Sequence, residues 1–443
     1  GTDKAVSQSR KHRKPGVSNG KVKKHKKVKE IKWTEGKDSK KPPITEKNTS
    51  NPNTSTSGDS GDVVSVGSSE LIKEAVYDVS YFIPFGVNNY LGSANASDRF
   101  VQYLAGMKVA TRILEKEGVN LNINVIDEKD RKFEDVLREN VNGNTDVIVG
   151  PYDRKNLKKA AKYAKDKRIP LVSPWQSSPK IAKNNPYYIQ LRPSLNEHYY
   201  AMFNDIKENF DRSQVIIIGR NTVTDDVKRL KRLQRMAADV WKVKEREPIE
   251  YYSVIQDSLD YGVTAFDSIF FEEKPTVILI PNWSFKKDEG FIYACLRRLS
   301  VEKGMNKVVV YGMPIMMESE KINFDFYSAL NMKVARSKFV DQQDYDVRRF
   351  KKDFVDTYGA LPTDSAFEGY DNLMYIGRNI TEYGKNFQYH LNNDRGFYLQ
   401  AGYNVTATNK SSSDDKPIIK YFENKNVDIV EFKNARFSRK PKS

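Results

Sequence analysis

Cysteine and histidine are scarce in this chain of 443 residues, and that scarcity excludes two kinds of site. The single cysteine, Cys295, lies in an apolar helical stretch, so neither a disulfide framework nor a CxxC metal or redox site can form. The four histidines are His12, His25, His198 and His390, and they form neither an HExxH motif nor a histidine-rich cluster. We therefore expect no metal ion.

Long apolar runs and nucleotide-binding motifs are also missing. No run approaches the roughly 18 apolar residues that a membrane-spanning helix needs, and no signal-peptide pattern is visible at Gly1. If the protein is exported, we expect its signal to have been removed already. The sequence has no GxSxG elbow, no P-loop and no GxGxxG after a strand. We therefore expect no cofactor and no catalysis.

Positive charge is abundant but unevenly spread. The formal net charge is +16, and residues 1–47 carry 16 Lys and Arg against 5 Asp and Glu, so +11 lies there and +5 in the other 396 residues. Because the excess sits in one Lys-rich segment, we expect no nucleic acid partner. Residues 1–68 are rich in Lys, Ser, Thr, Asn, Gly and Pro and show no apolar period, which predicts a disordered basic tail that acts as a tether.

From Tyr77 onward, short β-branched strands alternate with helices. The first series of predicted strands is 77–85, 121–128, 146–150 and 169–174. The pattern then restarts, with predicted strands at 214–219, 250–255, 276–282 and 307–312, and with helices between them that include 195–209 and 259–270. Two such series predict an α/β protein with two parallel sheets covered by helices on both faces. In such sheets ligands bind beyond the carboxyl ends of the strands.

Two separated motifs resemble a known family. The segment VIVGPYDRKNLKKAAKYAKDKRIPLVSPWQSSPKI at 147–181 is similar to the first-lobe signature of type I periplasmic binding proteins, the leucine/isoleucine/valine-binding group. The segment at 348–377 resembles their second hallmark, in which YG and a Pro precede a helix that opens on GYD. Phe85 and residues 169–174, 312–314 and 367–371 resemble more closely the binding-protein-like domains that Bacteroidota attach to LysM modules, although a basic tail stands here in place of a LysM module.

The resemblance implies two Rossmann-like lobes with parallel sheets, joined by a three-strand hinge. It places residues 77–192 and 331–385 in one lobe, and residues 193–330 and 386–435 in the other. Residues 436–443 are expected to form a basic C-terminal tail.

The resemblance also implies a ligand cleft between the lobes. In amino-acid-binding relatives, a small hydroxyl residue after the Gly-Pro turn and a Ser or Thr after the SP pair hold the ligand. Ser177 matches the second position, whereas Arg154 stands at the first, and residues 220–223 replace the usual aromatic-Gly pair of the second lobe. The cleft candidates are Tyr152, Arg154, Trp175, Gln176, Ser177, Asn221, Asn282 and Trp283.

Each of these side chains has two interpretations. Arg154 would pair with an anion or stay a solvated surface charge, and Trp175 or Trp283 would stack on a sugar or ring. Trp175 would otherwise cap the core of its lobe. Tyr370 and Asp371 are expected to fix helix packing at the hinge.

Three functions remain open at this stage. The first is a module that docks onto other cell-envelope proteins, as related outer-membrane lipoproteins of this fold do, located in the periplasm and anchored to the outer membrane by an N-terminal lipid through the basic tail. The second is a solute receptor for an amino acid, peptide or cell-wall fragment that serves a transporter or sensor. The third is a transcriptional regulator, which is disfavoured because residues 1–68 lack the apolar positions of a helix-turn-helix. The departures at Arg154 and Asn221 favour docking.

Overall fold

The structure is a computed structural model of the chain. It describes residues 32–35, 71, 73–86, 94–129, 131–178, 180–182, 184–244, 248–254, 266–393, 398–410 and 418–440.

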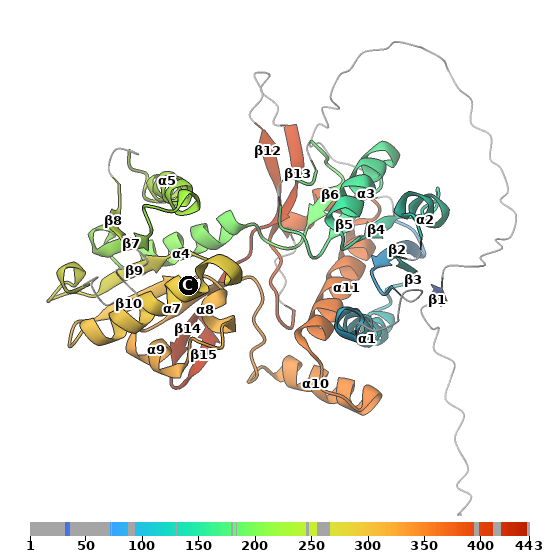
Figure 1. The fold of residues 1–443 in the computed structure, drawn as a ribbon. Coiled ribbons are helices and arrows are strands. Elements are labelled where there is room, and N and C mark those ends of the chain that lie inside the picture. Colours follow the sequence, from blue (N-terminus) through green and yellow to red (C-terminus); the bar gives the residue numbers. More distant parts are fainter. Residues whose placement is uncertain are drawn as a thin grey trace, which may run out of the picture. The chain divides into compact units, whose positions relative to one another are not determined.

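The first sheet has the strand order β1-β3-β2-β4-β5-β6-β13-β12 and is parallel except between β12 and β13 (Figure 1). Its strands are β1 (Lys32–Glu35), β2 (Tyr77–Ile83), β3 (Leu121–Asp127), β4 (Val147–Val149), β5 (Leu171–Ser173), β6 (Tyr188–Gln190), β12 (Val405–Lys410) and β13 (Ile418–Asn424). The helices of this part, which we call lobe 1, are α1 (Ala94–Lys116), α2 (Phe133–Asn140), α3 (Arg154–Lys167), α10 (Tyr345–Tyr358) and α11 (Asp364–Tyr383).

The second sheet has the order β15-β14-β11-β10-β9-β7-β8. The neighbouring strands from β11 to β8 in this order are all parallel to one another. Its strands are β7 (Val215–Gly219), β8 (Glu250–Ser253), β9 (Thr276–Ile280), β10 (Val308–Gly312), β11 (Lys333–Arg336), β14 (Asp428–Lys433) and β15 (Arg436–Arg439). The helices of this part, lobe 2, are α4 (Leu195–Asn209), α5 (Thr224–Trp241), α7 (Phe285–Glu302), α8 (Ile315–Glu318) and α9 (Phe324–Ala329).

The central strands are apolar throughout because helices cover both faces of the sheets. Every residue of β7 and of β9 is buried, which is the pattern of a strand inside a parallel sheet. Helix α3 shows how the covering helices form. Asp153 caps it by accepting hydrogen bonds from the backbone N of Lys155 and Asn156 at 2.8 and 3.0 Å, and Leu157 and Ala160 belong to the side buried against the sheet.

The prediction of a two-lobed α/β architecture is confirmed. The chain passes between the two sheets three times: between β6 and α4, between β11 and α10, and between β13 and β14. The expected division of the chain differs from the sheet order in detail. Strand β11 lies in the second sheet although residues 331–385 were expected in lobe 1, and β12 and β13 lie in the first sheet although 386–435 were expected in lobe 2.

The C-terminal end also differs from expectation. Residues 436–439 form β15, which pairs antiparallel with β14, where a basic tail was expected. Because residues 436–443 are rich in Lys and Arg, their sequence did not indicate the short edge strand that residues 436–439 form. Residues 441–443 lie outside the described residues.

Residues 1–68 were expected to carry no regular structure, and β1 departs from that. The four residues of β1 pair in parallel with Asn122–Val125 of β3. Without β1, β3 would be the edge strand of the sheet and its outer backbone groups would be unpaired. The rest of the expected tail lies outside the described residues. Of the helices that the structure describes, none combines the length and apolarity that crossing a bilayer requires.

Candidate functional site

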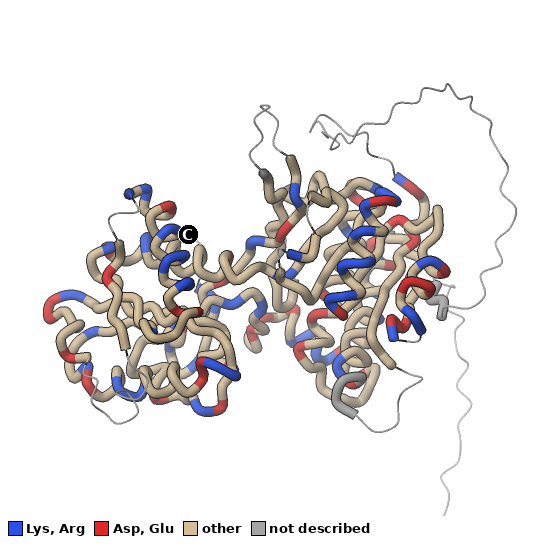
Figure 2. Tube along the Cα trace, turned by 45° about the horizontal axis from the view of Figure 1, so that its top comes forward, with Lys and Arg blue, Asp and Glu red and all other residues tan. Residues whose placement is uncertain are grey.

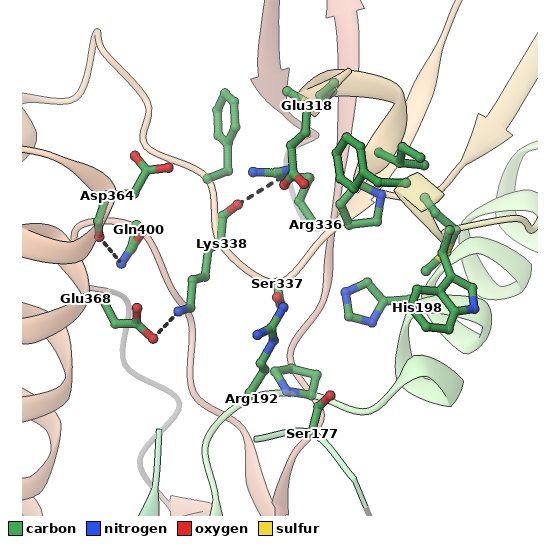
Figure 3. A pocket seen from close by; sticks show the side chains of 18 of the residues that line it. Ser177, Arg192, His198, Glu318, Arg336, Ser337, Lys338, Asp364, Glu368 and Gln400 are labelled. Carbon is green, nitrogen blue, oxygen red and sulfur yellow. Dashed lines mark hydrogen bonds and ion pairs between the residues drawn. The ribbon is translucent and has the colours of Figure 1, made fainter. Parts of the chain in front are cut away.

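A pocket of about 970 Å³ lies where segments of both lobes meet (Figure 3). Lobe 1 supplies Ser177 after β5 and the first turns of α11, and lobe 2 supplies the segments that follow β9 and β10. The lining also includes the crossing segments that follow β6 and β11, Leu195 and His198 of α4, Arg99 of α1, and Gln400. Ends of strands and first turns of helices therefore converge here, as expected for parallel sheets.

One part of the lobe 2 lining is apolar. We call Trp283, Phe285, Met313, Ile315 and Met317 the apolar wall. Trp283 and Phe285 are each 49% exposed, whereas Met313 and Ile315 are buried. Two half-exposed aromatic rings in one pocket present apolar surface that a ligand can cover.

Charged side chains from both lobes line the rest of the pocket. Glu368 is 5% exposed and pairs with Lys338 and, at 3.6 Å, with Arg99. Burial lowers the pKa of Lys338, and the neighbouring Glu368 carboxylate opposes that shift. Arg336 pairs with Glu318. These three cations already have carboxylate partners. They therefore contribute positive potential to the pocket more than they contribute free N–H donors.

Arg192 differs from Arg99, Arg336 and Lys338. Its Nη1 donates to the carbonyl oxygen of Trp175 at 3.3 Å, and it makes no ion pair within the described ranges. Figure 3 shows its side chain reaching into the pocket near Ser337. Its guanidinium therefore keeps donors for an anion, which such a group binds through charge-assisted hydrogen bonds.

His198 supplies an acceptor. It is 8% exposed, and its Nδ1 lies 3.0 Å from the carbonyl oxygen of Ser194. Because a carbonyl oxygen only accepts, Nδ1 carries the proton and Nε2 keeps its lone pair. Burial lowers the pKa of His198 to about 4, and the charges of Arg192 and Arg336 act in the same direction. The ring is therefore neutral at pH 7.

The chain is similar in sequence and in fold to known proteins. The family model "Receptor family ligand binding region" matches residues 100–265, and no curated protein matches the chain. A structure described as a branched-chain amino acid ABC transporter from Rhodospirillum rubrum is similar at 14% identity, covering 82% of this chain and 99% of that chain with a TM-score of 0.52.

Two further structures show the same likeness. An ABC transporter substrate-binding protein from Desulfitobacterium hafniense shares 12% identity and a TM-score of 0.51, over 82% of this chain and 99% of that chain. Full-length LpoA from Haemophilus influenzae also shares 12% identity and a TM-score of 0.51, over 82% of this chain but 59% of LpoA. The chain has the type I periplasmic binding protein fold.

Within this type I periplasmic binding protein fold, two of the eight expected cleft residues, Ser177 and Trp283, line the pocket. Trp175 is 3% exposed and packs in lobe 1 against Tyr103, with ring centroids 5.2 Å apart. Tyr152 is half-buried in the same aromatic group, 5.8 Å from Trp175, and its carbonyl accepts from Gln176 Nε2 at 2.8 Å. Trp175 thus belongs to the core of lobe 1, and Tyr152 packs against that core.

The other three candidates also lie away from the pocket lining. Arg154 is exposed and donates to Ser178 Oγ at 3.1 Å. Asn221 is exposed. Asn282 is 1% exposed, and its Nδ2 lies 3.3 Å from a carboxylate oxygen of Asp226.

The sequence reasoning missed Arg192, His198, Lys338 and Glu368. None of them follows a predicted strand of the two series. The only signal was the position of Arg192 and His198 at the first crossing between lobes, since crossing segments of this fold border the cleft. Among the described residues, no group of three or more His, Cys, Asp or Glu could hold a metal ion.

The depressed pKa of His198 predicts a pH-dependent stability. The unfolded chain binds a proton at this residue below about pH 6.5, whereas the folded chain binds it only near pH 4, so stability is complete above 6.5 and falls between 6.5 and 4. Wild type should therefore lose about 2 kcal/mol relative to His198→Asn between pH 7.5 and 5.0. Asn retains a donor for the Ser194 carbonyl without titrating.

Urea unfolding of both proteins at the two pH values measures this difference. Other groups act in the opposite direction: burial raises the pKa of Glu128, Glu197 and Asp371 to about 7, so these carboxyls stabilise the fold as pH falls. Because both proteins contain these carboxyls, the difference between wild type and variant cancels their contribution. Equal pH profiles for wild type and variant would show that His198 titrates normally.

Proposed function

We propose that the protein is a non-enzymatic receptor that binds one small amphipathic anion in the pocket between its lobes. The observation that carries this proposal is the placement of Arg192, without a carboxylate partner in the described part of the chain, in the same pocket as the half-exposed rings of Trp283 and Phe285. Small-molecule pockets typically enclose about 300–1,000 Å³ and combine apolar lining with a few placed polar groups. This pocket, at about 970 Å³, lies at the upper end of that range.

Charge supports an anionic ligand. The lining holds five Lys and Arg and three Asp and Glu, an excess of two positive charges: Arg99, Arg192, Lys286, Arg336 and Lys338 against Glu318, Asp364 and Glu368. Arg192 would hold a carboxylate or phosphate of the ligand. An aromatic ring or acyl chain would cover the apolar wall, and an O–H or N–H of the ligand would donate to His198 Nε2.

The similar transporter proteins do not supply the identity of the ligand. One of them is named for branched-chain amino acids, but in this chain Arg154, at a position where amino-acid-binding relatives carry a small hydroxyl residue, lies outside the pocket. A free amino acid would also leave much of the volume empty. We therefore favour a larger acid with one apolar part.

Removing the proposed anchor should weaken binding of such an acid at least tenfold. In Arg192→Gln the charge-assisted hydrogen bonds are lost, and bonds of this kind contribute roughly 1.5–3 kcal/mol. The matched control is Lys286→Gln, which removes the same charge from an exposed position of the lining. Isothermal titration with each protein measures the dissociation constants.

The ligand is found by thermal shift with acid and amide pairs: indole-3-acetate and its amide, N-acetylphenylalanine and its amide, and decanoate and its amide, with leucine as comparator. Binding to the native state alone stabilises it by about 2.7 kcal/mol at a hundredfold excess over the dissociation constant. We expect at least one acid to raise the melting temperature and its amide to fail. No shift with any acid, or equal shifts with acid and amide, would overturn the proposal.

Docking onto another envelope protein is the second candidate, and exposed apolar side chains favour it. Val101 on α1 is 56% exposed, and Leu361, just after α10, is 73% exposed. The two helices adjoin here, since Tyr358 Oη donates to the Ala105 carbonyl at 3.4 Å. Affinity isolation from envelope extract tests it: a partner retained by wild type and lost in Val101→Ser/Leu361→Ser would support docking.

Location in the periplasm is the coarse placement that this fold supports. Outer-membrane anchoring, an N-terminal lipid and a link to the LysM-associated proteins of Bacteroidota stay predictions. Cell fractionation with and without globomycin, which blocks maturation of lipoproteins, tests the first two.

A further inference from the structure

Helix α3 carries positive charge far beyond what its packing needs. Its 14 residues, RKNLKKAAKYAKDK, contain seven Lys and Arg and a single acid, Asp166. Leu157, Ala160, Ala161 and Ala164 are buried against the first sheet and account for its packing. The small alanines seat the helix close to the sheet, and its other side faces solvent.

Four lysines form one stripe on that outer side. Lys155, Lys158, Lys162 and Lys165, which we call the basic face, repeat at three- and four-residue spacing and are all exposed. No hydrogen bond or ion pair engages their side chains among the described residues, whereas the adjacent Lys159 pairs with Glu134 of α2 at 2.6 Å. Figure 2 shows the succession of Lys and Arg along this helix.

This arrangement is unfavourable for the helix taken alone. Like charges three and four residues apart repel on a helix surface, and Arg154 and Lys155 stand at the N-terminal end, where the helix dipole disfavours cations. The single acid, Asp166, lies at the C-terminal end of the helix. Of the four lysines of the basic face, Lys162 and Lys165 stand at neighbouring positions to it. Repulsion that the chain does not neutralise points to an anionic partner outside it.

The chemistry of the stripe selects the partner. A helix of 14 residues is about 20 Å long, and its lysines form a convex row on flexible stems that can reach a flat surface. Sequence-specific nucleic acid readers use Arg, Asn or Gln on base edges, and single-strand binders stack bases on exposed aromatic rings. The nearest aromatic residue, Tyr163, is half-buried, and the Lys167 ammonium lies 5.9 Å from its ring centroid.

We propose that the basic face of α3 binds the surface of a bilayer that contains anionic phospholipid. Each Lys near such a surface adds favourable energy that decays within a Debye length, so binding depends on the anionic lipid fraction and weakens in salt. The lysines stay in the headgroup region, because no large apolar side chain on this stripe could insert. This inference is independent of the ligand proposed for the pocket.

Sedimentation of the full chain with vesicles tests the proposal. The vesicles contain phosphatidylcholine alone or with 30% phosphatidylglycerol, which supplies the anionic headgroups. The variant carries Lys155→Gln, Lys158→Gln, Lys162→Gln and Lys165→Gln. The matched control replaces four exposed lysines of lobe 2 by Gln: Lys228, Lys231, Lys244 and Lys307.

We expect wild type to partition onto anionic vesicles and to be released by 0.5 M NaCl. The α3 variant should lose at least tenfold in partition coefficient, and the lobe 2 control less than twofold. Circular dichroism and melting establish that both variants fold, and wild type in a salt series gives a second test that needs no variant. Equal losses in the two variants, absence of preference for anionic vesicles, or α3-dependent binding to duplex DNA without vesicle binding would each overturn the proposal.

Discussion

Replacing Arg220 by Met should lower the free energy of unfolding by about 3–5 kcal/mol, the usual effect of removing one partner from a buried ion pair. Arg220 is 7% exposed and joins two buried carboxylates. Its Nε donates to Asp226 at 2.8 Å and its Nη2 to Asp288 at 2.5 Å. Its guanidinium also lies 4.5 Å from the centroid of the Phe291 ring. The variant would leave both acids buried, and Asp288 without its cation.

Urea unfolding measures the loss, and a double variant provides the control. In Arg220→Met/Asp288→Asn neither acid is left as an unpaired charge, because Asp226 keeps its ion pair with Arg229 at 2.9 Å, so part of the lost stability should return. A loss below 1 kcal/mol in the single variant would show that the network is not required for folding.

The same network supports the pocket. Asp288 accepts hydrogen bonds from the backbone N of Trp283 at 3.2 Å and of Ser284 at 3.1 Å. Arg220 therefore positions the start of α7, on which the apolar wall begins. The sequence resemblance predicted a departure from an aromatic-Gly pair at residues 220–223, and Arg220 acts within its own lobe.

Sequence patterning was sufficient for the central strands. VIIIG at β7 and TVILI at β9 are short apolar runs followed by turns, and buried parallel strands read this way. Strand β6 escaped because three residues, YIQ, are too few to show a period. Strands β14 and β15 escaped because Asn434 and Ala435, the turn between them, have φ of 50° and 61° without the Asn-Gly signal of such a hairpin.

The candidate site was harder to predict because it depends on where two separate sheets meet. Trp283 and Trp175 both follow strands, so sequence position alone treats them alike. The structure separates them: Phe100 and Tyr103 of α1 surround the Trp175 ring at 5.7 and 5.2 Å, whereas Trp283 stays half exposed. No local pattern reports a contact made by a helix some seventy residues earlier.

Replacing Gly369 by Ala should lower the free energy of unfolding by about 3 kcal/mol, the upper part of the range for overpacked cores. A Cβ at this position would lie 2.0 Å from the carbonyl oxygen of Tyr103 on α1, and one at Gly106 would lie 1.9 Å from the carbonyl oxygen of Ala366 on α11. The two helices thus approach backbone to backbone through reciprocal glycines. Since the obstacle is backbone, no side-chain rotation can relieve it.

Gly290→Ala is the matched control, because this glycine lies inside α7 and a Cβ added there would meet nothing within 4 Å. Alanine there should raise stability by about 0.5–1 kcal/mol through helix propensity alone. Chemical unfolding of the two variants therefore gives shifts of opposite sign from one chemical change. A loss under 1 kcal/mol in Gly369→Ala would mean that α1 and α11 separate easily. The expected loss instead makes the glycine of the F-x-GYD motif a packing requirement between α1 and α11, while Glu368 of the same motif lines the pocket.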